Sequence, residues 1–238
     1  MIDTILFDLG NTLVRYYGPH EFAAVLERSL GAARDSLRDG GYAAESFDVI
    51  RERAAAENYE TPDDRTRSLE GRLARIFSID AVDQDLLART ARDFMAPIFE
   101  MGTIYADTLP ALESLRRQGY KIGIVSNSPW GCPAGLLHAE LERHRLDGLV
   151  DAAIFCVEIG WRKPAPQIFH HALERMGAGA GRTLFVGDDR RWDVEGPRRI
   201  GMRAALLDRK GRLIDAGVPS IRSLDEIHSL ITGWREPV

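Results

Sequence analysis

Apolar and polar positions alternate in two different ways along this chain, and each way predicts a different kind of structure. Short, nearly uninterrupted apolar runs recur at 5–7, 121–125, 152–156, 183–186 and 204–207. Such runs are typical of strands that are buried on both faces of a parallel sheet. Helical spacing lies between them, as at 111–115 and 167–176. The pattern therefore predicts a three-layer α/β fold with a parallel sheet.

The second pattern runs from about residue 16 to residue 99 and lacks convincing strands. Apolar residues fall at helical spacing over 22–37, 69–77 and 86–94, and Gly40-Gly41 and 61–64 interrupt the helices. We expect an all-helical cap domain over about 16–101, inserted into an α/β core formed by residues 1–15 and 102–238.

Composition narrows the class of protein further. The 238 residues carry a formal net charge of -5, and the arginine clusters are interleaved with acidic residues, so we expect no nucleic-acid partner. No apolar run approaches the ~20 residues of a membrane span, and the chain enters a core strand almost at once, so we expect neither a membrane partner nor a signal peptide. Cys132 and Cys156 are isolated and form no metal-type pair. A cytoplasmic protein with reduced thiols is expected, and its oligomeric state stays open.

Polar residues stand where several of the predicted strands end. Asp8 follows the first apolar run, Ser126 ends the second, and Asp188 follows the run at 183–186. Ligands of open parallel sheets gather at the carboxyl ends of the strands, so these three side chains should face one crevice. Lys163 comes soon after the run at 152–156, just before Pro164.

Acidic residues are unusually dense in this predicted crevice. Asp8, Asp188, Asp189 and Asp193 cannot all be ionised side by side without compensation. One lysine and a divalent cation would provide it. Mg²⁺ is the natural candidate, because it is held by one or two carboxylates together with a substrate phosphate.

Four segments in this order resemble the motifs of the haloacid dehalogenase-like (HAD) hydrolase superfamily, in the branch whose helical cap follows the first motif. They are Asp-Leu-Gly-Asn-Thr-Leu at 8–13, Ile-Val-Ser-Asn at 124–127, Arg-Lys-Pro at 162–164, and Val-Gly-Asp-Asp at 186–189 with Asp193. The resemblance covers nearly the whole chain and is far more specific for the fold than for the substrate.

The resemblance implies a phosphatase that works through an aspartyl-phosphate. Asp8 would attack phosphorus, and Ser126, the backbone N–H of Asn127 and Lys163 would bind and neutralise the phosphoryl group. Mg²⁺ would be held by Asp8, the carbonyl of Gly10 and Asp188, while Asp189 and Asp193 would orient its waters and Lys163. The expected substrate is a small phosphorylated metabolite.

Gly10 departs from the family pattern, which usually has a second aspartate at this position to protonate the leaving oxygen and activate water. Glycine can do neither, and such help is worth roughly 10²–10⁴-fold in rate. Three explanations stay open. The substrate has a good leaving group, such as a sugar 1-phosphate or an acyl phosphate; another residue, with Asp189 as a candidate, takes over the proton; or turnover is weak or absent.

Two alternatives to a phosphatase remain. Haloacid dehalogenases of the superfamily also lack the second aspartate, since halide leaves without a proton, but they work without Mg²⁺ and do not keep this acidic last motif. A non-catalytic protein that binds a phosphate ligand or a partner would have no need of Asp8, Lys163 and the acidic cluster. Trp130, Trp161 and Arg162 either line the entrance to the site or pack in the core.

Overall fold

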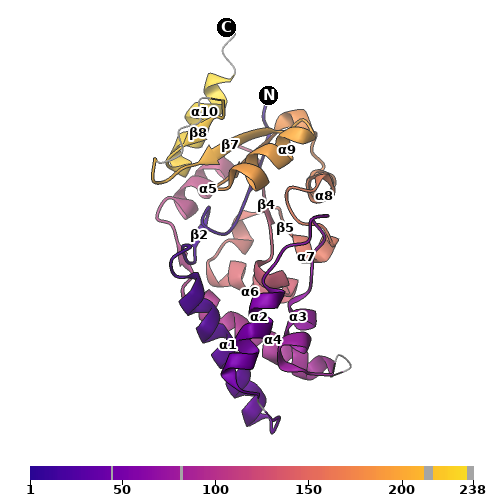
Figure 1. The fold of residues 1–238 in the computed structure, drawn as a ribbon. Coiled ribbons are helices and arrows are strands. Elements are labelled where there is room, and N and C mark those ends of the chain that lie inside the picture. Colours follow the sequence, from indigo (N-terminus) through magenta and orange to yellow (C-terminus); the bar gives the residue numbers. More distant parts are fainter. Residues whose placement is uncertain (44, 81–82, 212–216, 235–238) are drawn as a thin grey trace.

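A parallel sheet forms the centre of the computed structural model, which describes residues 1–43, 45–80, 83–211 and 217–234. The sheet has the strand order β5-β4-β1-β6-β7-β8, and every neighbouring pair is parallel. The expected α/β class is confirmed (Figure 1). The strands are β1 (Thr4–Phe7), β4 (Lys121–Ser126), β5 (Ala152–Phe155), β6 (Thr183–Gly187), β7 (Arg203–Leu207) and β8 (Ser220–Ile221).

Successive side chains of each strand enter two separate apolar layers. Ile5 and Phe7 of β1 pack on one face of the sheet, whereas Leu6 packs on the other. The first face is covered by α5 (Thr108–Arg117), α6 (Ala134–Arg143) and α10 (Ile227–Gly233). The second is covered by α8 (Pro166–Met176), with α7 (Cys156–Ile159) and α9 (Gly196–Arg199) beside it. Each large apolar side chain buried in this way contributes about 1.5–3 kcal/mol, which explains the unbroken apolar runs.

The helical segment forms the lower half of the molecule in Figure 1, away from both termini. It contains α1 (Phe22–Asp39), α2 (Phe47–Glu57), α3 (Leu69–Phe77) and α4 (Gln84–Glu100), with α1 packed along α4. A short antiparallel pair, β2 (Val14–Arg15) and β3 (Thr103–Ile104), lies where the chain leaves the sheet and where it returns. The division into a core and a cap at residues 15/16 and 101/102 stays a prediction, and this strand pair is consistent with it.

Three elements differ from the sequence-based expectation. Cys156, expected to end a strand, begins α7. The helix α2 was not predicted, because it buries only Ile50 and Ala54 and its apolar side is narrow. Strand β8 has two residues, too few for a periodic signal. Within the described ranges, no helix combines the length and apolar character that a bilayer crossing requires.

Candidate active site

Three adjacent strands bring the predicted site residues together. Asp8 directly follows β1, Ser126 is the last residue of β4, and Asp188 follows β6; β4 and β6 flank β1. Asp8 and Ser126 are buried, with 7% and 6% of their surface exposed. The Ser126 hydroxyl donates to Asp8 Oδ1 over 3.2 Å. The carboxyl ends of the strands therefore form one polar site, as expected.

Lys163 lies at the centre of this site. Its Nζ donates to Asp8 Oδ1 over 2.6 Å and to Asp193 Oδ1 over 2.7 Å, and its side chain is 1% exposed. Burial by itself would lower the pKa of Lys163, but the carboxylates of Asp193 and Asp8 outweigh burial and hold that pKa above its usual value. Lys163 therefore remains an ammonium ion, and it lies over the Phe185 ring with Nζ 5.3 Å from the ring centroid.

The backbone of Lys163 is held in place by Asn127. The Lys163 N–H donates to Asn127 Oδ1 over 2.8 Å, and Asn127 Nδ2 donates to the Lys163 carbonyl over 3.2 Å. Two hydrogen bonds between the same residues fix the loop after β4 to the loop that carries Lys163. This positioning contact was not predicted for the Asn127 side chain, and the expected role of its backbone N–H stays a prediction.

Asp193 is carried by a π-helical turn, η4 (Arg190–Glu195), which follows Asp189. Its Oδ2 accepts from the Asp189 N–H over 3.0 Å, so hydrogen bonds occupy both carboxylate oxygens. A Cβ on Gly187 would lie 2.3 Å from Asp193 Cγ, so position 187 cannot carry a side chain while Asp193 holds this place. The Asp189 carboxylate accepts from the backbone N–H of Trp192 over 2.8 Å, whereas the Asp193 carboxylate contacts Lys163.

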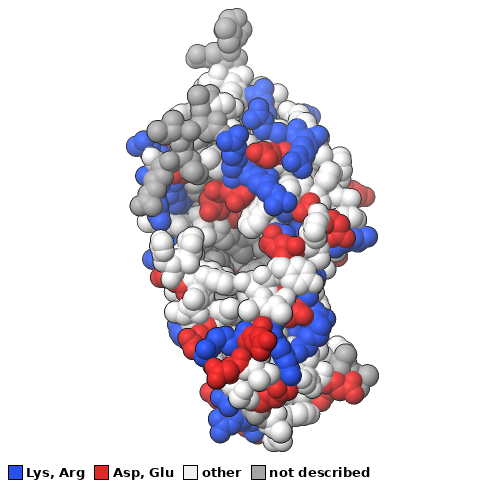
Figure 2. Space-filling model, in the orientation of Figure 1, with Lys and Arg blue, Asp and Glu red and all other residues white. Residues whose placement is uncertain are grey.

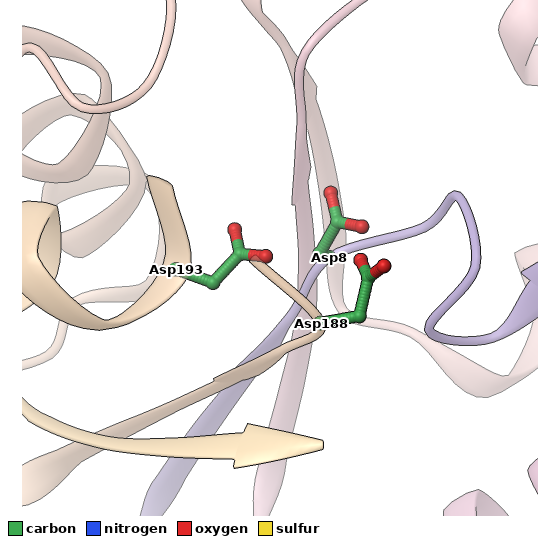
Figure 3. Close-up of side chains that lie close together, drawn as sticks. All are labelled: Asp8, Asp188 and Asp193. Carbon is green, nitrogen blue, oxygen red and sulfur yellow. The ribbon is translucent and has the colours of Figure 1, made fainter. Parts of the chain in front are cut away.

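Three carboxylates converge at the strand ends. Asp8, Asp188 and Asp193 point toward one another from different elements (Figure 3), and one oxygen of each lies within 4.8 Å of the others. Burial and the negative charges of Asp8 and Asp193 raise the pKa of Asp188 to about 8. Burial also raises the pKa of Asp193 to about 7, where the nearby Asp8 adds to the effect and Lys163 opposes it. One ammonium ion therefore does not compensate this cluster, and a divalent cation fits it.

Thr12 is a member of the site that sequence reasoning missed. Its buried hydroxyl lies 3.3 Å from Asp8 Oδ2 and 3.4 Å from Asp188 Oδ1, so it can donate to one of them at a time. Its position four residues after Asp8, inside the first motif, was the available signal.

A cavity of about 650 Å³ extends from these carboxylates to the helical segment. Figure 2 shows the surface hollowed between the upper part of the molecule and the lower, helical part. Gly10 and Tyr16 line the cavity near Asp8, and a Cβ on Gly10 would meet only Tyr16 Cδ2, at 3.8 Å. Trp130 and Arg162 also line it, which places both at the cavity rather than only in the core.

Comparison with known proteins agrees with this geometry. A family model described as haloacid dehalogenase-like hydrolase matches residues 2–201. Phosphatase MT3486 of Mycobacterium tuberculosis is 37% identical over 155 residues, which are 65% of this chain and 67% of that protein. The ribulose-1,5-bisphosphate 5-phosphatase of Halopiger xanaduensis is 30% identical over 211 residues, covering 87% of this chain and 85% of that protein.

Solved structures of the same family share the fold of this chain. The HAD phosphatase from Thermococcus onnurineus has a TM-score of 0.65 at 26% identity, covering 98% of this chain and 99% of that one. The 2-haloacid dehalogenase from Pseudomonas syringae pv. Tomato DC3000 has a TM-score of 0.72 at 22% identity, covering 98% and 100%, and this likeness shows the fold alone. The chain belongs to the haloacid dehalogenase-like hydrolases and is an enzyme of that family.

Proposed function

We propose that this hydrolase is a Mg²⁺-dependent phosphatase that cleaves a small phosphate monoester through an aspartyl-phosphate on Asp8. The observation that carries the proposal is the environment of Asp8. Its carboxylate borders the cavity while Lys163 and Ser126 hold one of its oxygens. A nucleophile beside a permanent positive charge suits phosphoryl transfer, in which catalysis is mostly positioning and electrostatic stabilisation. Relatives named as phosphatases support the reaction class.

The carboxylate cluster supports a divalent metal. Asp8 and Asp188 are the proposed side-chain ligands, with the Gly10 carbonyl as a third, and Thr12 is close enough to orient both carboxylates. We assign Asp193 to positioning, because it is 1% exposed and its oxygens accept from the Lys163 ammonium group and from the Asp189 N–H. When bound, Mg²⁺ would supply positive charge to the phosphoryl oxygens and lessen the repulsion between the carboxylates.

The residues of the chain divide the remaining work. The Asp8 carboxylate attacks phosphorus as the bond to the leaving oxygen breaks, and water then hydrolyses the aspartyl-phosphate. Lys163 holds the Asp8 carboxylate by a hydrogen bond and neutralises charge that develops on the phosphoryl group, while Ser126 donates a hydrogen bond to that group. Asp193 and Asn127 hold the ammonium group and the backbone of Lys163 in place.

Gly10 provides no proton for the leaving oxygen, so the preferred substrates should be those whose leaving group is stable as an anion. Sugar 1-phosphates and acyl phosphates are of this kind. Asp189 stays a candidate for the proton transfer, because it borders the cavity and is half-buried, although its carboxylate also accepts from Trp192.

Dehalogenation is the second candidate, and Gly10 is the observation that favours it, since halide departs without a proton. The acidic cluster opposes it, because Asp188 and Asp193 would repel an anionic haloacid in the absence of a metal.

The test is phosphate release from a panel of sugar 1-phosphates, sugar 6-phosphates and an acyl phosphate, with Mg²⁺ and with chelator. Asp8→Asn is the matched control, because it keeps the size of the side chain and removes the nucleophile. Turnover that requires both Mg²⁺ and Asp8 supports the proposal. Halide release from 2-haloacids without any phosphate release would favour dehalogenation instead, and unchanged phosphate release in Asp8→Asn would exclude the aspartyl-phosphate.

A further inference from the structure

The helical segment also contributes a charged side chain to the cavity wall. Arg72 lies on α3 of the helical segment, lines the cavity, and is only 8% exposed. Burial of a guanidinium is costly unless an anion or several hydrogen bonds compensate it. Burial indeed lowers the pKa of Arg72, and the nearby positive charge of Arg67 lowers it further.

The hydrogen-bond partners of Arg72 are carbonyl groups. Its Nη1 donates to the Glu57 carbonyl over 2.6 Å, and its Nη2 to the Tyr59 carbonyl over 3.3 Å. Among the residues that the structure describes, its buried Nε has no hydrogen-bond partner. These contacts fix the guanidinium in place, and no carboxylate of the described ranges is in direct contact with it.

The acidic side chains nearest to Arg72 are already engaged by other arginines. The Glu57 carboxylate accepts from Arg67 and Arg75, and Glu60 pairs with Arg162. Counting Arg72, this group of side chains contains four guanidinium groups and two carboxylates. Of these, Arg67, Arg72, Arg162 and Glu60 border the cavity. Three guanidinium groups therefore accompany one carboxylate there, and the wall around Arg72 carries an excess of positive charge.

An aromatic ring closes the other side of Arg72. The guanidinium carbon lies 5.5 Å from the centroid of the Trp130 ring, which also borders the cavity. Trp130 has a φ of 56°, a left-handed conformation that a bulky residue rarely adopts. Backbone strain of this kind often accompanies function, and here the strained residue packs its ring against the Arg72 guanidinium.

We propose that Arg72 forms the centre of an anion-binding subsite in the cap wall of the cavity, which binds a second anionic group of the substrate. The substrate would thus be a phosphate monoester that carries, away from the scissile phosphate, a carboxylate or a second phosphate. This inference rests on the proposed function for the identity of the first anionic group. It assigns that group to Lys163 and the metal, and the second to Arg72.

The direct test compares esters that differ only in the second anion. One pair is 2-phosphoglycolate and 2-hydroxyethyl phosphate; the other is a propanediol bisphosphate and its monophosphate. The wild-type enzyme should favour the doubly anionic member of at least one pair by roughly 10- to 100-fold in kcat/KM, the range expected for a hydrogen bond to a charged group. The pair that shows the preference identifies the second anion as carboxylate or phosphate.

Arg72→Met should remove this preference, mainly by raising KM for the doubly anionic ester, while the ester that lacks the second anion keeps its kcat/KM. Arg75→Met is the matched control, because Arg75 lies on the same helix, is exposed, and does not border the cavity. If Arg72 only braces the chain at Glu57 and Tyr59, both members of a pair will lose activity equally. The wild-type comparison needs no variant, so it holds even if Arg72→Met folds poorly.

Failure of the subsite and failure of the proposed function give different results. Turnover of both esters at equal rates by the wild type would overturn the subsite and leave the phosphatase intact. If the wild type turns over neither ester, calorimetry would measure binding of the doubly anionic ester to Asp8→Asn and to Asp8→Asn/Arg72→Met. Binding of the doubly anionic ester that depends on Arg72, without turnover by the wild type, would support the subsite and reject the phosphatase. Equal binding to both variants would overturn the subsite.

Discussion

Restoring a carboxylate at position 10 tests the explanation for the unusual first motif. The backbone of Gly10 is not in the left-handed region, and a Cβ there would meet only Tyr16 Cδ2, at an ordinary van der Waals distance of 3.8 Å. Because Gly10 borders the cavity beside Asp8, the rest of an aspartate side chain can extend toward the substrate. Gly10→Asp should therefore fold and place an acid near the leaving group.

The size of the gain depends on the leaving group. General acid–base help is worth roughly 10²–10⁴-fold, or about 2.7–5.4 kcal/mol of barrier. We expect the lower end for an introduced residue, about 100-fold or about 2.7 kcal/mol, for alkyl phosphates. Neighbouring Asp8 and Asp188 disfavour another negative charge, which keeps the new carboxyl protonated and suited to donate. Aryl phosphates with acidic leaving groups should change little.

The assay is kcat/KM for phosphate esters whose leaving groups span a wide range of pKa. In the wild type, the rate should fall steeply as the leaving group becomes more basic, and Gly10→Asp should flatten this dependence. Gly10→Asn is the matched control, since it fills the same space and transfers no proton. An unchanged slope in folded Gly10→Asp, or equal gains in the aspartate and asparagine variants, would show that the missing acid at position 10 does not limit the rate.

Three further predictions concern the charge cluster. Lys163→Met removes the buried ammonium group between two carboxylates, so kcat should fall at least about 10²–10³-fold. The free energy of unfolding, measured in urea, should fall by about 3–5 kcal/mol. A normal kcat would contradict the proposed role of Lys163. Gly187→Ala places a Cβ 2.3 Å from Asp193 Cγ and should cost about 1–3 kcal/mol in thermal unfolding, whereas Gly181→Ala, with no atom within 4 Å of its added Cβ, should cost little. The pKa values of Asp193 (about 7) and Asp188 (about 8) are raised above the ordinary value of 3.8. Without metal, the folded protein therefore binds more protons than the unfolded chain between pH 3.8 and 8. Its stability should fall as the pH rises through this range. Mg²⁺ should then raise Tm more at pH 8 than at pH 5, and an equal rise at both would count against the cluster as the metal site.

The sheet and its polar edge could be predicted because the relevant signals are local. Continuous apolar runs mark strands buried on both faces, and a polar residue at the end of each run lies at the same edge of a parallel sheet. Asp8, Ser126 and Asp188 met these conditions, and the structure brings them together. The family and the enzyme class followed from the order of the motifs and are confirmed by the family match.

The part of the cavity wall that the helical segment forms could not be predicted in this way. Arg72 is one of 31 lysines and arginines in the chain, and no spacing sets it apart from Arg75 on the same helix. Its environment depends on how α3 packs against the segment that carries Trp130. That contact joins residues that are distant in sequence, so no local pattern reveals it. The helix α2 escaped prediction for a related reason, since its short buried side is decided by tertiary packing rather than by a wide apolar face.

The proposed aspartyl-phosphate on Asp8 can be trapped and detected in a single turnover. A preferred ester would be mixed with excess enzyme and Mg²⁺, quenched in acid within one turnover, and the peptide that carries Asp8 would be analysed by mass spectrometry. We expect this peptide to gain a phosphoryl group that is lost with hydroxylamine, and we expect Asp8→Asn to stay unmodified. Substrate consumption in one turnover without any phosphoryl group on Asp8 at any quench time, or modification of another residue instead, would contradict the proposed mechanism.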